Sequence, residues 1–133
     1  MPDNGITTIA SAFSVSETID RLIAAITPLG MNVFARIDHA AGAAKVGMPL
    51  RPTQLLLFGN PKGGTPLMQD RQTAGIDLPL KALAWEDSGG KAWLTYNEAA
   101  WIAQRHGLGA ASAAAVTAIA AGLEKVTKAA AAK

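Results

Sequence analysis

The feature that most constrains the fold is a short run that is apolar on both faces and passes directly into glycine-rich chain. Residues 54–58 read Gln-Leu-Leu-Leu-Phe, which is typical of a strand buried inside a sheet. This strand is therefore expected to be the most buried one of the sheet. The 133 residues, 50% hydrophobic and 17% charged, are enough for one domain with a core.

Residue patterns predict an α+β domain built on a mainly antiparallel sheet of about five strands. Alternation and β-branched runs predict strands at 5–13, 31–39, 54–58, 80–86 and 91–96. Helical periodicity predicts helices at 15–26, 66–72, 97–106 and from 113, with one or two turns within 40–47. The expected order is β-α-β-β-(short α)-β-β-α-α, with the helices packed on one face. Residues 1–133 are expected to form a single domain, with a core over about 5–107 and an alanine-rich helix over about 111–131.

Local signals place several element boundaries. Ser14, with Glu17 three residues later, predicts a capping box at the first helix. Thr65 followed by Pro66 predicts the start of the short helix, and Asn97 and Ser112 are expected to cap the last two. Gly107 is expected to end the helix before it. The alanine-rich end of the chain, 129–133, is expected to fray.

The three tryptophans are expected to pack together. Trp85 and Trp93 lie on the two arms of a hairpin closed by 87–90, so they are predicted to be nearly opposite on one face. Trp101 lies on the helix that follows. Together they are expected to close one aromatic cluster between sheet and helix, or to form a dimer patch if they are exposed.

Composition excludes several function classes. Cysteine is absent, which excludes disulfides and thiolate chemistry, and two histidines leave little for a metal site, so no metal and no cofactor is expected. The formal net charge is only +2, without a basic stripe interleaved with aromatics, so no nucleic-acid partner is expected. The N-terminus has no apolar signal segment and no stretch is suited to a membrane span, so a cytoplasmic location is expected.

The stretch from Gly59 to Thr65 is the main candidate binding site. A strand leads into glycines and then into a helix start, where unpaired amides carry partial positive charge. Asn60, Lys62, Gly63, Gly64 and Thr65 are therefore candidates to hold a carboxylate or phosphate. The alternative is that the glycines only turn the chain and Thr65 only caps the helix.

A histidine at a strand end is the other candidate group. His39 follows Asp38, and a neutral imidazole there can act as a base or a ligand, although a partly exposed turn residue is the simpler interpretation. Asp38 and Glu86 are weaker candidates. Glu86 is also expected to pair across the hairpin with Lys91. His106, at a helix C-terminus, is assigned no chemistry.

Several separated motifs resemble the domain-of-unknown-function family numbered 302. They are the run from Leu55 through Gly63-Gly64 to Met68, Asp38-His39 at a strand end, and the stretch from Gly75 through Trp85-Glu86-Asp87. The resemblance covers roughly residues 5–100. It implies a small bacterial α+β domain that forms a homodimer, and it implies no activity.

Three functions remain open. The first is a homodimeric domain that binds a small anionic ligand or a partner through Gly59–Thr65. The second is a small enzyme that uses His39 on an anionic substrate, which requires His39 to lie within about 10 Å of that stretch. The third is an assembly domain that docks through its alanine-rich C-terminal helix. Enzymatic activity is left open, with binding favoured over catalysis.

Overall fold

The strands pair into one antiparallel sheet in the order β1-β5-β4-β3-β2, seen in a computed structural model that describes residues 4–133. The strands are β1 (Ile6–Ala10), β2 (Asn32–Asp38), β3 (Thr53–Gly59), β4 (Leu80–Glu86) and β5 (Ala92–Asn97). The helices are α1 (Val15–Ile26), η1 (Thr27–Leu29), α2 (His39–Lys45), α3 (Pro61–Asp70), η2 (Gln72–Asp77), α4 (Ala99–His106) and α5 (Ala113–Ala131). The predicted α+β class with five antiparallel strands is confirmed.

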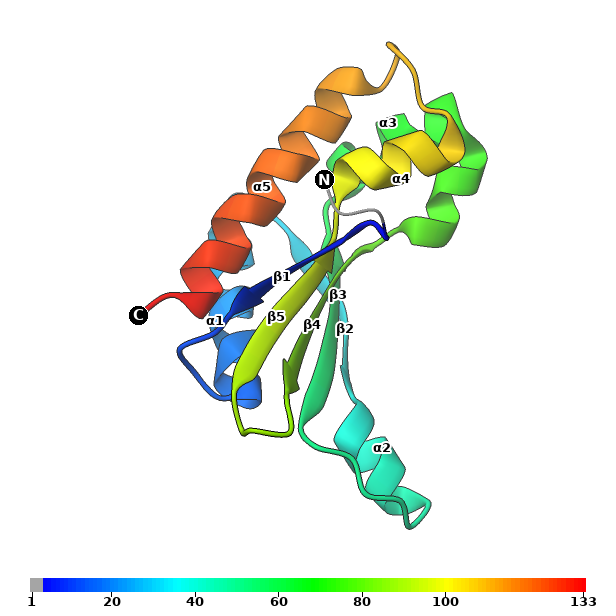
Figure 1. Ribbon diagram of the computed structural model, residues 1–133. Helices are drawn as coiled ribbons and strands as arrows, with labels where there is room; N and C mark the ends of the chain where they lie inside the picture. Colours follow the sequence, from blue (N-terminus) through cyan, green and yellow to red (C-terminus); the bar gives the residue numbers. More distant parts are fainter. Residues whose placement is uncertain (1–3) are drawn as a thin grey trace.

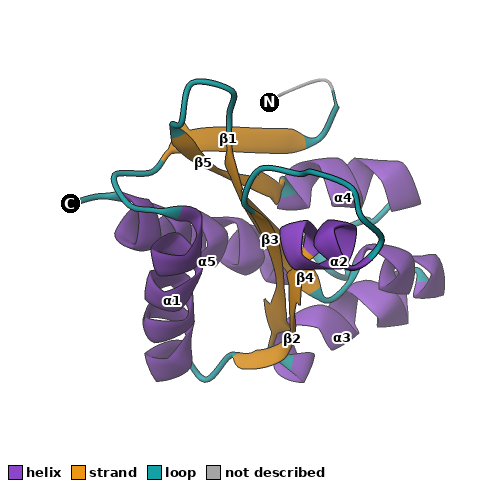
Figure 2. Ribbon diagram, turned by 90° about the horizontal axis from the view of Figure 1, so that it is seen from below, coloured by secondary structure: helices purple, strands orange, loops and turns teal. Residues whose placement is uncertain are grey.

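The helices form one layer and two end groups around the sheet. α1 and α5 lie side by side over one face of the sheet (Figure 2). α3, η2 and α4 gather at one end of the strands, whereas α2 projects from the opposite end (Figure 1). In the described part of the chain, no helix combines the length and hydrophobicity needed to cross a membrane.

The core lies between the sheet and the α1–α5 layer. Ile19, Leu22 and Ile26 of α1 are fully buried, as the predicted helical stripe requires. They pack over Leu56 and Phe58 of β3, which are also fully buried. Alternate residues of β4 facing this layer are alanines, and their small side chains allow α1 to approach the sheet closely.

Both ends of the α1–α5 layer are fixed by side-chain hydrogen bonds. Ser14 Oγ accepts from the Glu17 N–H at 3.1 Å, which confirms Ser14 as the cap of α1, one half of the predicted capping box. At the end of α5, Arg21 donates to the carbonyls of Ala129, Ala130 and Ala132 at 3.0–3.1 Å. The expected fraying is wrong for residues 129–131, which remain helical because a cation from α1 satisfies the last carbonyls and Ala130 is fully buried. Residues 132–133 lie beyond the helix and are exposed.

Two predicted helix caps differ in detail. α4 begins at Ala99 with Glu98 in the cap position, because Asn97 remains paired with Ile6 in the sheet. Gly107 ends α4 in the left-handed conformation with φ of 65°, as expected. Ser112 precedes α5 as expected, but its hydroxyl makes no cap hydrogen bond within that helix.

β2 departs from the simple alternation expected of it. A bulge between Val33 and Ala35 breaks the register, so these two residues do not share a face as predicted. β2 is an edge strand and most of its residues are exposed. The bulge leaves Phe34 with 54% of its surface exposed near the start of α3.

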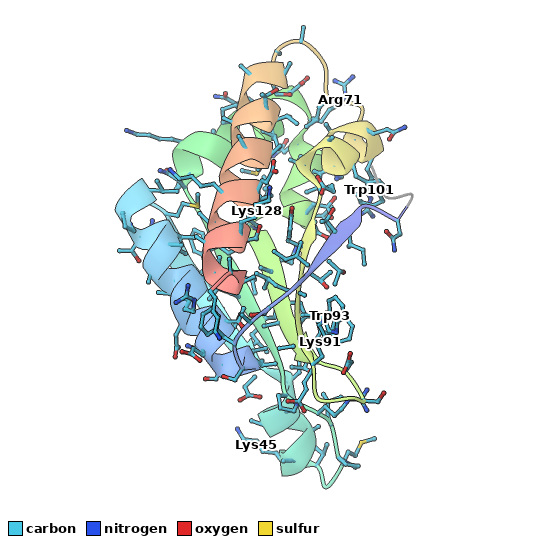
Figure 3. All side chains as sticks on the ribbon, turned by 60° about the vertical axis from the view of Figure 1, so that its left-hand side comes forward. Lys45, Arg71, Lys91, Trp93, Trp101 and Lys128 are labelled. Atoms are coloured by element: carbon cyan, nitrogen blue, oxygen red, sulfur yellow. The ribbon has the colours of Figure 1, made fainter. Side chains whose placement is uncertain are left out.

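The tryptophans form a pair, not a cluster of three. Trp85 and Trp93 are directly opposite across the hairpin, with ring centroids 6.2 Å apart, as expected. Trp101 lies apart from Trp93, on α4, where it packs against Gly5 (Figure 3). The predicted three-membered cluster is therefore wrong, because the Trp85–Trp93 pair projects from the sheet face opposite to that of Leu94 and the core.

Candidate functional site

The glycine-rich segment is the first part of α3. Asn60 occupies the cap position and its Oδ1 accepts from the Lys62 N–H at 3.0 Å, while Pro61 is the first helical residue. The predicted start at Thr65 and Pro66 is wrong. Asn60-Pro61 supplies the same cap-and-proline signal directly at the end of β3, and the helix begins there.

The amides of this helix start are already engaged. Gly63 and Gly64 donate to the Asn60 carbonyl at 2.8 and 3.1 Å, and the Lys62 amide is held by the Asn60 side chain. Pro61 has no N–H. The prediction that these amides bind an anion is therefore wrong, since the amides donate to oxygens of the protein.

A cavity of about 670 Å³ lies against this segment, between α3 and α5. That volume is in the range of small-molecule sites. Five of the six main candidate residues line it, namely Asn60, Lys62, Gly63, Gly64 and Thr65. The rest of the wall is made by Leu29, Met31, Phe34, Gly59, Pro61, Met68, Gly75, Leu78, Pro79, Leu80, Ala115, Ala118, Ile119 and Gly122.

The wall of the cavity is mainly apolar. Its aliphatic, thioether and aromatic side chains come from η1, β2 and the connection between them, from α3, from β4 and the η2–β4 connection, and from α5. Among the described residues that line the wall, Lys62 is the one charged residue, and Asn60 and Thr65 are the only uncharged polar ones. The site can therefore bury an apolar ligand, with a single positive group available at one place.

Glycines make room for the cavity on the α3 side. Gly63 and Gly64 lie inside α3 with right-handed backbone, so neither is needed for a positive φ. A Cβ at Gly63 would lie 4.0 Å from Ile119 Cγ1, and one at Gly64 would lie 3.4 Å from Leu78 Cδ1. Both are ordinary contacts. Packing therefore tolerates alanine at both positions. Glycine inside a helix nevertheless lowers the free energy of unfolding by about 0.5–1 kcal/mol relative to alanine.

Hydrogen bonds at both ends of α3 fix the width of the cavity. Asn60 Nδ2 donates to the Gly30 carbonyl at 3.3 Å and joins the start of α3 to η1. At the other end, Asp70 accepts from Ser112 Oγ at 2.7 Å and from the Gly109 N–H at 2.9 Å. These bonds join α3 to the start of α5. The Ser112 hydrogen bond is the main reason that the pKa of Asp70 lies below its usual value.

His39 is not part of this site. In the β2–β3 ladder Asn32 pairs with Gly59 and Asp38 pairs with Gln54, so the two ends of β2 are about 20 Å apart at about 3.3 Å per residue. His39 begins α2 at the far end, where it is exposed, and Asp38 accepts from the Ala41 N–H as the cap of α2. The proposed convergence of His39 with the glycine-rich segment is therefore wrong.

Glu86 also lies away from the cavity. It is opposite Ala92 in the hairpin, near the end of the sheet that carries α2. Lys91 Nζ lies 4.5 Å from the centre of the Trp93 ring, where the cation stacks on the aromatic face. The expected ion pair between Glu86 and Lys91 is replaced by this contact.

A polar cluster around His106 was not foreseen from the sequence. His106 Nε2 lies 2.6 Å from Asp77 Oδ2, its Nδ1 lies 3.1 Å from Thr73 Oγ1, and its side chain is only 7% exposed. Arg105 adds a second bond to Asp77. Residues about 30 positions apart in a helix and a 3-10 helix carry no shared motif that could reveal the cluster. Its effect is to hold η2, which contributes Gly75 to the cavity wall, against α4.

No metal site accompanies the cavity. Over residues 4–133, the structure brings no three His, Cys, Asp or Glu side chains together in a way that could hold an ion. The chemistry that the cavity itself offers is apolar contact with one ammonium group.

Comparison with known proteins gives a family without an assigned activity. Residues 7–130 match the family model described as domain of unknown function DUF302. The structure of an uncharacterized conserved DUF302 protein from Bacillus stearothermophilus superposes with a TM-score of 0.84 over 94% of this chain and 97% of that one. The sequence identity is 17%, so this likeness concerns the fold. The matched range includes α5, which the resemblance seen in the sequence left outside the core.

Close sequence relatives carry a channel name. The chain is 55% identical over 126 residues to proteins called "Fluoride-specific ion channel FluC 1" from Brucella suis biovar 1 (strain 1330) and Brucella abortus biovar 1 (strain 9-941). The match covers 95% of this chain but 50% and 47% of those proteins. The chain therefore spans about half the length of these relatives.

Proposed function

This chain belongs to the DUF302 family, and on that premise we propose that it binds a small, mainly apolar molecule with an anionic end in the cavity between α3 and α5. The apolar wall supplies the binding free energy, at about 25 cal/mol for each Å² of apolar surface removed from water. Lys62 is available to pair with the anionic end. No catalytic step is proposed.

The observation that carries this proposal is the glycine pair in α3. Gly63 and Gly64 weaken the helix, although neither backbone conformation nor packing demands glycine there. Both line the cavity, and side chains at these positions would reduce its volume. A local cost in stability that creates binding space is a common property of functional sites.

A fluorescent amphiphile tests the proposal. 8-Anilinonaphthalene-1-sulfonate combines apolar rings with one sulfonate, and we expect its fluorescence to rise on binding to the native protein. Gly63→Leu should abolish this signal, whereas Gly42→Leu should leave it unchanged, because Gly42 lies on α2 with open space around it. Equal signals from both variants would contradict the proposal.

A homodimer is the second part of the proposal. The segment that follows α2 projects from the sheet and exposes 71% of Val46 and 63% of Met48 (Figure 1). Exposed apolar side chains on a projecting segment support contact with a second copy. Sedimentation should give a dimer for the native chain and a monomer for a Val46→Glu, Met48→Glu double variant. A native monomer at micromolar concentration would refute this part.

The cytoplasmic location expected from the sequence also stays a prediction.

The channel name of the relatives is not extended to this chain. Its sheet ends in two edge strands, β1 and β2, whose outer backbone groups face no further strand within residues 4–133. Such edges are not compatible with exposure to lipid, where each unpaired backbone group costs several kcal/mol. We propose that the chain corresponds to a part of those proteins other than the pore. Fluoride flux in vesicles that contain only this chain would contradict this assignment.

A further inference from the structure

The groups that could receive the polar end of a ligand are few. Both polar atoms of the Asn60 side chain are engaged, Oδ1 with the Lys62 amide and Nδ2 with the Gly30 carbonyl. The amides of the first turn of α3 are engaged as well. The Lys62 ammonium and the Thr65 hydroxyl therefore remain for the ligand. One compact anionic group can bind to these two groups. A ligand with many polar groups would leave several of its own polar groups without a hydrogen-bond partner.

The length of the cavity follows from the two helices that form it. Its wall extends from Pro61 to Met68 along α3 and from Ala115 to Gly122 along α5. Seven residues at 1.5 Å per residue give about 10 Å along each helix. An extended hydrocarbon advances about 1.3 Å per carbon for C–C bonds of about 1.5 Å, so about eight carbons span this length.

The wall is also adaptable where the cavity meets solvent. Met31 and Met68 line it, and the flexible thioether side chain adjusts to the shape of its contacts. Phe34, which β2 presents through its bulge, lines the cavity and is 54% exposed. These side chains suit a flexible chain that enters from the open side.

Resting on the proposed function, we infer that the ligand is an acyl-chain carboxylate or an equivalent amphiphile of about eight carbons. Its chain lies along α3 and α5, and its anionic end is next to Lys62. Apolar burial dominates the affinity, because Lys62 is exposed and a surface ion pair contributes little.

Calorimetric titration with straight-chain carboxylates from butanoate to dodecanoate tests this inference. The affinity should rise about fourfold per added methylene group up to about eight carbons and then level off. Octanoate should bind about two- to fivefold more tightly than 1-octanol, and Lys62→Met should remove that difference. Gly63→Leu should lower the octanoate affinity at least tenfold, with Ala118→Phe on the α5 side as a second blocking variant and Gly42→Leu as the control.

The outcomes separate this inference from the function on which it rests. If an aromatic sulfonate binds in a way that Gly63→Leu blocks while the carboxylates show no dependence on chain length, the inference is wrong and the proposed function stands. If no apolar compound binds in a way that Gly63→Leu or Ala118→Phe blocks, both are wrong. A rise that continues without levelling to dodecanoate would overturn the assigned length.

Discussion

Replacing Gly63 by alanine should stabilise the protein and weaken ligand binding at the same time. The new methyl group meets Ile119 Cγ1 at 4.0 Å, so it fits without displacing a neighbour. Removing a helical glycine contributes about 0.5–1 kcal/mol. For 133 residues at about 2.1 cal/mol/K each, the unfolding entropy is about 0.28 kcal/mol/K, and Tm should rise by about 2–4 °C.

Binding should change in the opposite direction, because the methyl group lies in space that the ligand would occupy. Calorimetric melting and titration with octanoate on the same samples measure both effects. Gly42→Ala is the matched control, since Gly42 is also in the first turns of a helix and meets no atom within 4 Å. It should raise Tm similarly and leave affinity unchanged. A destabilised Gly63→Ala protein, or one with unchanged affinity, would show that the glycine pair does not exchange helix stability for ligand space.

Four further outcomes are expected. Phe58→Ala should lower the free energy of unfolding by about 3–5 kcal/mol in urea titration, because the ring is fully buried; a loss under 1 kcal/mol would contradict the assigned core. Arg21→Met should cost about 1–2 kcal/mol and speed amide exchange at the end of α5, since three carbonyls lose their donor. His106→Ala should speed amide exchange in η2 more than in the sheet. An equal increase in η2 and in the sheet would show that the cluster does not hold η2. Hydrogen bonds hold the pKa of Asp70 and of Asp87 below the usual value, so the stability that these carboxylates contribute is present above about pH 4 and is lost as the pH falls through the lowered folded pKa. As the pH is lowered from 7 to 2, Tm should therefore fall less steeply in Asp70→Asn and in Asp87→Asn than in the native protein. Parallel curves would contradict this.

The sheet and the first helix are predictable because their signals are local. In β4 and β5, alternate residues face the core, and the turn between the strands is fixed by Asp87, which accepts from the Gly89 and Lys91 amides. In α1, the cap at Ser14 and the apolar stripe agree with each other. The bulge in β2 is not predictable in this way, since it depends on how an edge strand meets its neighbour.

The candidate segment is predictable, but its chemistry is not. Two cap-and-proline signals, Asn60-Pro61 and Thr65-Pro66, compete for the start of α3, and local sequence does not rank them. The start of α3 decides whether Gly63 and Gly64 precede the helix with free amides or lie inside it and line the cavity wall. The cavity also needs η1, β2 and α5, which are distant in sequence and meet only in the folded chain.

The two histidines show the same limit. His39 follows an acid at a strand end, which is suggestive in sequence, yet it is exposed and far from the cavity. His106 gives no sequence signal, yet it is buried between Asp77 and Thr73. The burial of His106 and its hydrogen-bond partners result from the packing of η2 against α4.

Methyl NMR of the methionines tests the ligand site most directly. Met31 and Met68 line the cavity, whereas Met48 lies beyond α2 at the other end of the sheet. On titration with octanoate, we expect saturable shifts of the Met31 and Met68 methyl signals and none at Met48. Shifts confined to Met48, or no shift at any of the three for octanoate and for an aromatic sulfonate, would contradict a ligand site between α3 and α5.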